Sequence, residues 1–281
     1  MSGFELLQAI GYEGDIFLPV VRILREKGAS WWDIMKFMIL RVVVSTKYRE
    51  FPILHVPDVI PIYNRYDLLA YRELFLLDDY RASLWVPGLM EAVAPLVLDV
   101  GANVGMFAAL CRKINPGVRL RCFEMMPACA AIIARRLKAM GDGDFEVLSS
   151  VVMAGDGETV TIAYDSPFAP GNAVKRTEGH SRVQVSAISL DVWWRVVGEK
   201  TGPFVVKIDV EGSEGEVWKG GRKCITSATW VLIELHGHTL DGAFPGLEET
   251  HAIKYFAKKT NDMSVAILER SRPEIIETLN A

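Results

Sequence analysis

The segment LVLDVGANVGMFAAL, residues 96–110, contains three structural signals in succession. It begins with the apolar run Leu96–Val100, which predicts a buried strand. A turn containing Gly101 and Gly105 follows, and residues 106–114 then have the apolar spacing of a helix. A strand, a glycine turn and a helix in this order are typical of the unit that opens a doubly wound parallel sheet. Ligands of such sheets bind beyond the carboxyl ends of the strands.

Strands and helices alternate along the rest of the chain, which predicts an α/β fold built on a parallel sheet. Apolar runs predict further strands at residues 118–124, 145–153, 158–164, 182–190, 204–210, 229–237 and 264–270. Helical spacing predicts helices at residues 127–140, 214–221 and 249–259. In such a sheet the segments DVGANVG, FEMM, DVEGSE and ELHGH lie together at the edge where ligands bind.

The first part of the chain has a different pattern. Residues 1–84 are expected to form a mostly helical extension or cap, and residues 85–281 to form the main domain. Helices are predicted at residues 4–10, 15–28, 30–45 and 67–80, the last with Asp67 as its N-cap, and an extended segment at residues 53–63. The amphipathic helix at 30–45 could pack on its own domain, form a homodimer or touch a membrane surface.

The composition is that of an ordinary globular protein, with 50% hydrophobic and 23% charged residues among 281. The net charge of −4 argues against a nucleic-acid-binding protein, which usually carries a basic surface. The most apolar stretch, residues 31–44, is interrupted by Asp33, Lys36 and Arg41, so no membrane-spanning segment is expected. The start of the chain lacks a signal-peptide pattern, and the four cysteines have no metal-binding spacing. Together these features predict a cytoplasmic protein.

The glycine turn fits two cofactors unequally. A dinucleotide site needs G-x-G-x-x-G, but the second and third glycine positions hold Asn103 and Met106. S-Adenosyl-L-methionine (AdoMet) has no phosphates; it needs a turn that admits its methionine part and a carboxylate for its ribose, which Glu124 supplies at the end of the next strand. A turn that only packs helix on strand is the remaining alternative. The residues expected to bind AdoMet are Asp99, Gly101, Ala102, Asn103, Gly105, Phe107, Glu124, Met125 and Asp209.

Four segments together resemble the FkbM family of AdoMet-dependent methyltransferases: DVGANVGMF, FEMMP, VVKIDVEGSEGEVWKGG and IELHG. The resemblance covers residues 67–237, and KIDVEG is its most specific part. It implies a Rossmann-like, seven-stranded class I methyltransferase sheet and O-methylation of a small-molecule or sugar acceptor. The chain departs from the family pattern at Met125, where the family has proline, and at residues 153–157, where MAGDG replaces the usual SDxxG.

Methylation of a hydroxyl group requires an aligned acceptor and a group that removes its proton. Asp209 ends its strand near the expected methyl position, and Glu234 and His236 lie two apart on the next strand, facing one side of the sheet. We predict these three as catalytic residues, with His236 as general base; a structural histidine is the alternative. Glu211 is left without a role. The three could also hold Mg²⁺ or Mn²⁺, but no second carboxylate or asparagine adjoins Glu234, so no metal is expected.

Other charged residues of this segment are given structural roles. Lys207 is expected to form an ion pair with Asp209 or Glu234, because a buried ammonium group needs a partner. Glu214 and Glu216 fall in the first turn of a helix, where carboxylates complement the helix dipole, so neither needs a catalytic role.

The polar loop at residues 165–182 is expected either to contact the acceptor or to be a solvated mobile segment. Lys175, Arg176, His180 and Arg182 make it locally basic. The expected partner is a small-molecule or glycan acceptor rather than nucleic acid. Two other functions stay open: a nicotinamide-dependent oxidoreductase on a similar sheet, and a protein that binds AdoMet without turnover.

Overall fold

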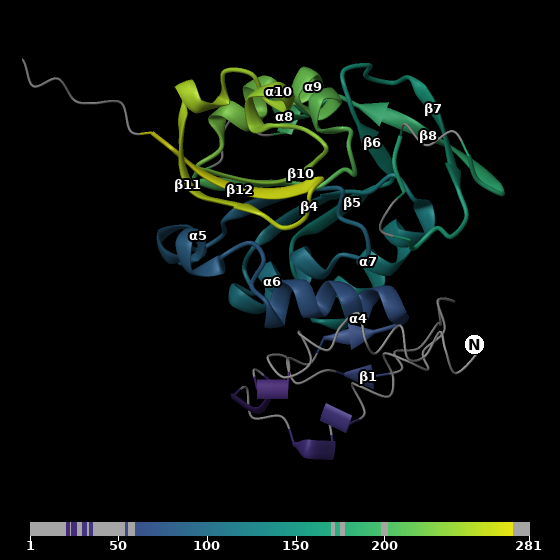
Figure 1. Ribbon diagram of the computed structural model, residues 1–281, viewed down its shortest axis with the longest axis vertical. Helices are drawn as coiled ribbons and strands as arrows, with labels where there is room; N and C mark the ends of the chain where they lie inside the picture. Colours follow the sequence, from purple (N-terminus) through teal and green to yellow (C-terminus); the bar gives the residue numbers. More distant parts are fainter. Residues whose placement is uncertain are drawn as a thin grey trace, which may run out of the picture.

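The computed structural model describes residues 60–169, 172–174, 178–197 and 202–271, and short stretches at residues 21–22, 24–26, 30–32, 34–35 and 54–55. Within these residues, a largely parallel sheet with helices on both faces forms the body of the molecule (Figure 1). The predicted helices at residues 4–10, 15–28 and 30–45 lie wholly or largely outside the described residues. None of the described helices is long and apolar enough to span a bilayer.

Within the described chain, seven strands form the main sheet, in the order β11-β12-β10-β9-β3-β4-β5. Their bounds are β3 Leu96–Val100, β4 Arg119–Phe123, β5 Phe145–Leu148, β9 Phe204–Ile208, β10 Trp230–His236, β11 His251–Lys258 and β12 Met263–Arg270. β12 runs antiparallel to both of its neighbours, and the other pairings are parallel. In the sheet, β4, the next strand of the main sheet along the chain, lies on one side of β3, and β9, which comes much later in the chain, lies on the other side. The carboxyl ends of β3 and β9 therefore form the switch point where such sheets bind ligands. This topology confirms the predicted Rossmann-like, seven-stranded sheet.

Helices cover both faces of the sheet (Figure 1). They are α5 (Ala82–Leu89), α6 (Met106–Ile114) and α7 (Pro127–Ala139) on one face, with α8 (Leu190–Val197), α9 (Glu214–Ser227) and the short α10 (Leu240–Ala243) on the other. Side chains of β3 alternate between the two layers. Leu96, Leu98 and Val100 join the core beneath α8 and α9, whereas Val97 packs with α5, α6 and α7. Every residue of β3 is buried, as its continuous apolar run predicts.

A second, three-stranded sheet is inserted between β5 and β9. It contains β6 (Ser150–Val152), β7 (Thr159–Tyr164) and β8 (Ser181–Ile188), in the order β6-β8-β7. The segment predicted as one strand at residues 145–153 is therefore divided between two sheets. Residues 165–180 connect β7 to β8, and the described residues Pro167, Ala169, Asn172 and Val174 lie beside the carboxyl edge of the main sheet.

The prediction of a helix at residues 249–259 is wrong, because β11 occupies this segment. β11 pairs along its length with β12, with a bulge between Ile253 and Tyr255. An edge strand of mixed polarity has no clear alternation, and the pairing partner decides its conformation. His251, which was expected on a surface helix, is buried at the start of this strand.

Before α5, the described elements are β1 (Leu54–His55), β2 (Pro61–Ile62), α4 (Arg65–Tyr71) and the π-helix η1 (Arg72–Leu76). A buried ion pair joins α4 to α7. Asn64, not Asp67, is the N-cap of α4, since its side chain accepts hydrogen bonds from the main chain of the first turn. Asp67 instead pairs with Arg136 of α7, and both side chains are fully buried. The prediction of Asp67 as a cap is wrong because its carboxylate is needed to compensate Arg136.

Candidate active site

The glycine turn after β3 approaches the end of β9 so closely that a side chain is excluded. Gly101 has a φ of +74°, and a Cβ atom built there would lie 1.8 Å from the carbonyl oxygen of Asp209. The main-chain nitrogens of Gly101 and Ala102 both donate to the carbonyl of Phe123 at the end of β4. The turn thus joins the ends of three strands, and its main chain is open to a ligand at the carboxyl edge. Gly105, with a φ of +76°, then starts α6 against Ile133.

Glu124 lies where the sequence predicted a ribose-binding carboxylate. It follows β4 directly, is buried, and accepts hydrogen bonds from the main-chain nitrogens of Asn103 at 2.7 Å and Met126 at 2.8 Å. Burial raises the pKa of Glu124 to about 7, although the two hydrogen bonds oppose this shift. These bonds fix the carboxylate at the rim of the glycine turn, at hydrogen-bonding distance from its main chain.

A cavity that is open to solvent lies beside this carboxylate, with about 620 Å³ of empty space when its open mouth is included. Five of the nine predicted AdoMet-binding residues line it, namely Gly101, Asn103, Glu124, Met125 and Asp209. Hydrophobic and small residues complete its wall, among them Val151, Cys129, Pro167, Ala169, Asn172 and Val174. The other four predicted residues, Asp99, Ala102, Gly105 and Phe107, are not among the lining residues; they hold the turn and α6 in place.

Lys207 of β9 is a buried cation that contacts three groups at this edge of the sheet. Its Nζ donates to the carbonyl of Gly101 at 2.7 Å and lies 3.2 Å from Asp99 and 3.5 Å from Asp209. Burial opposes the charge on Lys207, but Asp99 and Asp209 outweigh it and raise the pKa of the ammonium group. The predicted ion pair with Asp209 is thus present, together with a shorter one to Asp99 that the sequence did not reveal.

Asp209 also contacts a residue that sequence reasoning missed. The hydroxyl of Tyr80, which precedes α5, lies 3.4 Å from Oδ2 of Asp209, a distance longer than that of a strong hydrogen bond. Burial raises the pKa of Tyr80 well above its usual value, so the hydroxyl stays protonated. The ring packs edge-on against Phe107. Since 129 residues separate Tyr80 from Asp209, no local pattern could have indicated the contact.

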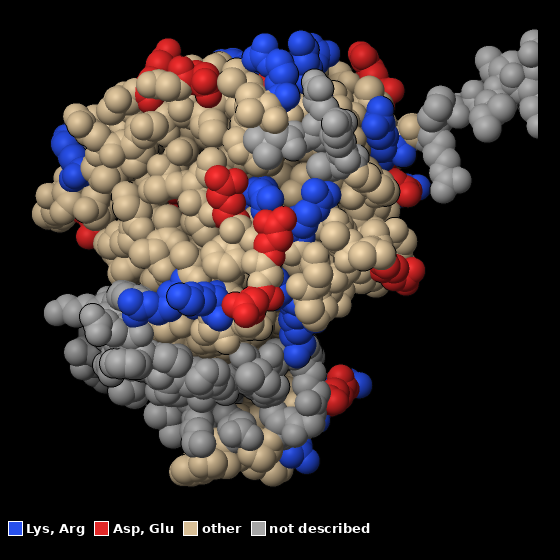
Figure 2. Space-filling view, turned by 180° about the vertical axis from the view of Figure 1, so that it is seen from behind, with Lys and Arg blue, Asp and Glu red and all other residues tan. Residues whose placement is uncertain are grey.

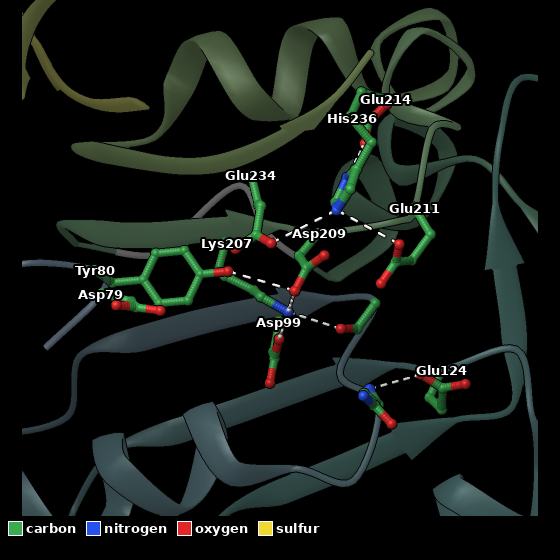
Figure 3. A network of polar contacts seen from close by, with 12 residues as sticks. Asp79, Tyr80, Asp99, Glu124, Lys207, Asp209, Glu211, Glu214, Glu234 and His236 are labelled. Atoms are coloured by element: carbon green, nitrogen blue, oxygen red, sulfur yellow. Dashed lines mark hydrogen bonds and ion pairs between the residues drawn. The ribbon is translucent and has the colours of Figure 1, made fainter. Parts of the chain in front are cut away.

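Glu234 and His236 face each other at the end of β10, as the two-residue spacing predicted. Nε2 of His236 lies 3.5 Å from Oε1 of Glu234 and 3.5 Å from Oε2 of Glu211, while Nδ1 contacts Oε1 of Glu214 at 2.9 Å (Figure 3). Oε2 of Glu234 lies 3.3 Å from Nζ of Lys259, in the turn after β11. The histidine is therefore enclosed by three carboxylates.

This enclosure changes the expected role of His236. Burial alone would lower the pKa of His236, but the neighbouring carboxylates of Glu214 and Glu234 outweigh burial and raise it to about 10. An imidazole that is protonated at neutral pH does not favour a role as general base. Glu214 is fully buried and orients the ring, so it does more than complement the helix dipole.

Backbone strain is concentrated around the same edge. Among the described residues, the non-glycine residues with positive φ are Asp78, Arg81, Asn103 and Glu211. Asp78 and Arg81 bracket Asp79 and Tyr80, while Asn103 lies in the glycine turn and Glu211 follows β9. Strained backbone of this kind collects at functional sites, where it fixes side-chain positions.

The model of one protein family matches more than half of the chain. That model, described as the methyltransferase FkbM domain, aligns with residues 99–262. These residues include the glycine turn, Glu124, Asp209 and the three carboxylates around His236. The chain belongs to the FkbM methyltransferase family. It is an AdoMet-dependent methyltransferase, as the four sequence segments indicated. The FkbM assignment also decides between the two cofactors that the glycine turn allowed.

Two named relatives of this FkbM chain are methyltransferases. Hexuronic acid methyltransferase AglP of Haloferax volcanii is 27% identical over 61% of this chain and 70% of its own length. The 2-O-methyltransferase NoeI of Sinorhizobium fredii is 24% identical over 57% of this chain and 71% of its own length. A solved fibrillarin–Nop5p complex aligns with 81% of this chain and 93% of the matched chain, at 11% identity and a TM-score of 0.44.

The described part of the loop that was expected to contact the acceptor lies against the cavity. Pro167, Ala169, Asn172 and Val174 are among the lining residues. His180 is exposed and pairs with Asp165 at 2.6 Å, and Arg182 is exposed at the start of β8. Lys175 and Arg176 lie outside the described residues. The described part of the loop thus forms part of the cavity wall, and a contact with the acceptor stays a prediction.

Proposed function

We propose that this methyltransferase transfers a methyl group from AdoMet to a hydroxyl group of a sugar-like small molecule. The observation that supports the proposal most strongly is the position of Asp209. Its main chain closes on Gly101 in the glycine turn, and its side chain belongs to the carboxylate cluster with Glu234 and His236. A methyl donor lying along the turn and an acceptor hydroxyl among the carboxylates would therefore meet at Asp209.

AdoMet would occupy the cavity in a defined direction. Glu124 would accept hydrogen bonds from the ribose hydroxyls, and Met125 and Val151 would pack beside the adenine. The methionine part would follow the open main chain at Gly101 and Asn103, with its methyl group toward Asp209. The four predicted residues outside the cavity wall, Asp99, Ala102, Gly105 and Phe107, would act by shaping the turn.

The reaction is an in-line displacement at the methyl carbon. The acceptor oxygen forms a bond to this carbon, the carbon–sulfur bond breaks, and its electron pair returns to sulfur to give S-adenosylhomocysteine. The hydroxyl proton passes to a carboxylate at the edge, Asp209 or Glu211, and then to solvent. Alignment of the two reactants can supply about 7–11 kcal/mol of the barrier reduction. Glu234 and His236, the other two predicted catalytic residues, would hold the acceptor.

The relatives and the charge distribution favour a sugar-like acceptor. AglP is named for hexuronic acid, a sugar acid, and NoeI is named for methylation of an oxygen atom. On the face shown in Figure 2, Lys and Arg side chains are interspersed with Asp and Glu rather than gathered in one basic surface. A nucleic-acid acceptor would call for such a surface.

The extension is part of the proposed site. We divide the chain into an extension at residues 1–84 and a methyltransferase domain at residues 85–281. The extension supplies Tyr80, which contacts Asp209, and Asp79, which pairs with Lys259 at 2.8 Å. The methyltransferase domain would thus need the extension for a complete acceptor side.

The test is a screen of acceptors with methyl-labelled AdoMet, in which uronic acids, neutral hexoses, nucleosides and RNA are compared. We expect label in an O-methyl ether of a sugar, identified by mass spectrometry and NMR. AdoMet binding without transfer to any acceptor would instead indicate a non-catalytic protein. Calorimetry that detects NADH binding and no AdoMet binding would overturn the proposal.

A further inference from the structure

The carboxyl edge of the sheet holds more carboxylates than cations (Figure 3). In its described part the network contains Asp79, Asp99, Asp209, Glu211, Glu214 and Glu234, against Lys207, Lys259 and His236. These side chains are mostly half-buried or buried. Uncompensated carboxylates are costly in such surroundings. Burial raises the pKa of Glu211 to about 7 and the pKa values of Asp99 and Asp209 above their usual range, so the network can take up protons or a further positive charge.

Three ligand atoms in this network converge on one point. Asp209, Glu234 and His236 each offer one such atom, and these atoms all lie within 4.8 Å of one another. In an octahedral site with bonds of about 2.1 Å, neighbouring ligand atoms lie about 3 Å apart and opposite ones about 4.2 Å apart. The limit of 4.8 Å on the distances between the three ligand atoms is slightly longer than the distance between opposite ligands. A small movement of the side chains would therefore let them share a small divalent cation.

The lysines leave the required atoms available. Lys207 and Tyr80 both contact Oδ2 of Asp209, so neither uses Oδ1. Lys259 contacts Oε2 of Glu234, whereas Oε1 faces His236. Each carboxylate thus keeps one oxygen that no lysine contacts, and in Glu234 this oxygen, Oε1, lies 3.5 Å from Nε2 of the histidine.

The imidazole of His236 supplies a second, independent observation. Its Nε2 is buried and has no hydrogen-bond partner among the described residues, although Glu211 and Glu234 both lie 3.5 Å away. Its Nδ1 is engaged by Glu214, which fixes the ring orientation. A histidine whose outer nitrogen is held by a carboxylate, with the inner nitrogen directed at oxygen ligands, is the usual arrangement of a metal-binding histidine.

We propose that Asp209, Glu234 and His236 bind a divalent cation of the Mg²⁺ or Mn²⁺ class, which in turn binds the acceptor hydroxyl. Two carboxylates and one imidazole suit Mn²⁺ and related ions and leave open positions for substrate oxygens. The cation would take the place of the proton on Nε2 of His236, which would leave to solvent. The inference rests on the proposed function, because the cation would polarise the hydroxyl that receives the methyl group. Glu211 is then the remaining carboxylate that takes the hydroxyl proton as the oxygen–carbon bond forms and the carbon–sulfur bond breaks.

This proposal departs from the sequence-based expectation of no metal. That expectation rested on the absence of a second ligand beside Glu234 in the chain. The tertiary structure brings Asp209, which was already in the candidate set, close to Glu234 and His236, and it fixes His236 through Glu214 of α9. The site combines residues from neighbouring strands, so adjacency in the sequence is not required.

The test uses the full chain, stripped with EDTA and titrated with Mn²⁺ in the presence and absence of S-adenosylhomocysteine. Loss of the free Mn²⁺ signal in electron paramagnetic resonance gives the affinity, and nitrogen modulation of the bound-ion signal reports imidazole coordination. We expect one Mn²⁺ per chain with coordinated nitrogen. Asp209→Asn, Glu234→Gln and His236→Gln should each lower Mn²⁺ affinity at least about tenfold. Glu216→Gln is the control, because Glu216 lies on α9 near the site but pairs with Lys219. This variant should bind Mn²⁺ as the wild type does.

The outcomes separate this inference from the proposed function. Wild-type protein that binds S-adenosylhomocysteine but no Mn²⁺ at millimolar concentration would overturn the cation site and leave the cofactor site intact. Mn²⁺ binding without nitrogen modulation would also overturn the cation site. The wild-type spectrum gives this answer by itself, so the test does not depend on whether a variant folds. Bound Mn²⁺ with no affinity for S-adenosylhomocysteine or AdoMet would support the cation site and contradict the proposed function.

Discussion

The carboxylate of Glu214, at the start of α9, contacts Nδ1 of His236, at the end of β10, at 2.9 Å. Glu214 also accepts a hydrogen bond from the main chain of Gly212 at 3.0 Å. A side chain that the sequence places on a helix terminus thus orients the histidine of the neighbouring strand.

Replacing Glu214 should therefore impair both folding and turnover. Glu214→Ala removes the acceptor that holds Nδ1 of His236 and one acceptor of the Gly212 main chain, both at part-buried positions, which should lower the free energy of unfolding by about 1–3 kcal/mol. The freed histidine should lower kcat about 10–100-fold, since small misplacements of reacting groups have effects of this size. Glu214→Gln retains an acceptor oxygen and should recover most of the stability. Urea unfolding and steady-state kinetics measure both effects.

Glu216→Ala is the matched control for Glu214. Its carboxylate lies two residues further along α9 and pairs with Lys219 near the surface. Its unfolding free energy should change by less than about 0.5 kcal/mol. Equal effects at the two positions would show that Glu214 acts only on the helix terminus.

Gly101 should tolerate no side chain. In Gly101→Ala the new Cβ meets the main-chain oxygen of Asp209, which has no rotamer to move aside, and φ is +74°. We expect a loss of at least about 3 kcal/mol in unfolding free energy, together with loss of AdoMet binding. Gly215→Ala is the comparison, because no heavy atom of the described residues lies within 4 Å of its Cβ position in α9. It should be neutral or stabilising by up to about 1 kcal/mol. A stable Gly101→Ala protein that binds AdoMet would contradict the close approach.

The affinity for AdoMet should depend on pH through Glu124. The cofactor-free carboxyl has a pKa of about 7, raised by burial, whereas ribose hydroxyls donate to the charged form. Binding therefore favours deprotonation, and affinity should be constant above pH 7 and fall below it, by up to about tenfold per pH unit. Calorimetry in buffers between pH 5 and pH 8 measures the trend. Glu124→Gln should bind more weakly and lose this dependence; an unchanged pH profile in that variant would assign the titration to another group.

Tyr80→Phe should affect the acceptor side of the site without changing the cofactor side. The substitution removes the hydroxyl near Asp209 but keeps the ring against Phe107. We expect kcat to fall about threefold to tenfold, in line with the loss of one weak hydrogen bond, while AdoMet affinity measured by calorimetry stays the same. Tyr164→Phe, on β7 of the small sheet, should leave both quantities unchanged. An unaffected kcat in Tyr80→Phe would remove the extension from the proposed acceptor side.

The cofactor side of the site could be predicted because its signals are local. The five-residue apolar run of β3, the glycines that follow and the acid after β4 stand in fixed order along the chain. The topology of a doubly wound sheet then brings them to one edge. Gly101 and Glu124 lie at that edge for this reason.

The acceptor side could be predicted only in part. Asp209, Glu234 and His236 were identified because each ends a strand. Tyr80, Lys259 and the orienting role of Glu214 were missed, since these contacts join elements distant in the chain and have no spacing rule. The helix predicted at residues 249–259 was wrong for the same reason, because pairing with β12 decides its conformation.

The sequence by itself determined the fold class, the glycine turn and the family, because these depend on periodicity and short motifs that local sterics enforce. Only the tertiary structure decided how the charges are shared. In the folded protein, Asp99 forms an ion pair with Lys207, and His236 lies among Glu211, Glu214 and Glu234. One oxygen of Glu234 lies close to the imidazole. Electrostatic partners depend on distance in space and on burial, and neither can be read from the order of residues alone.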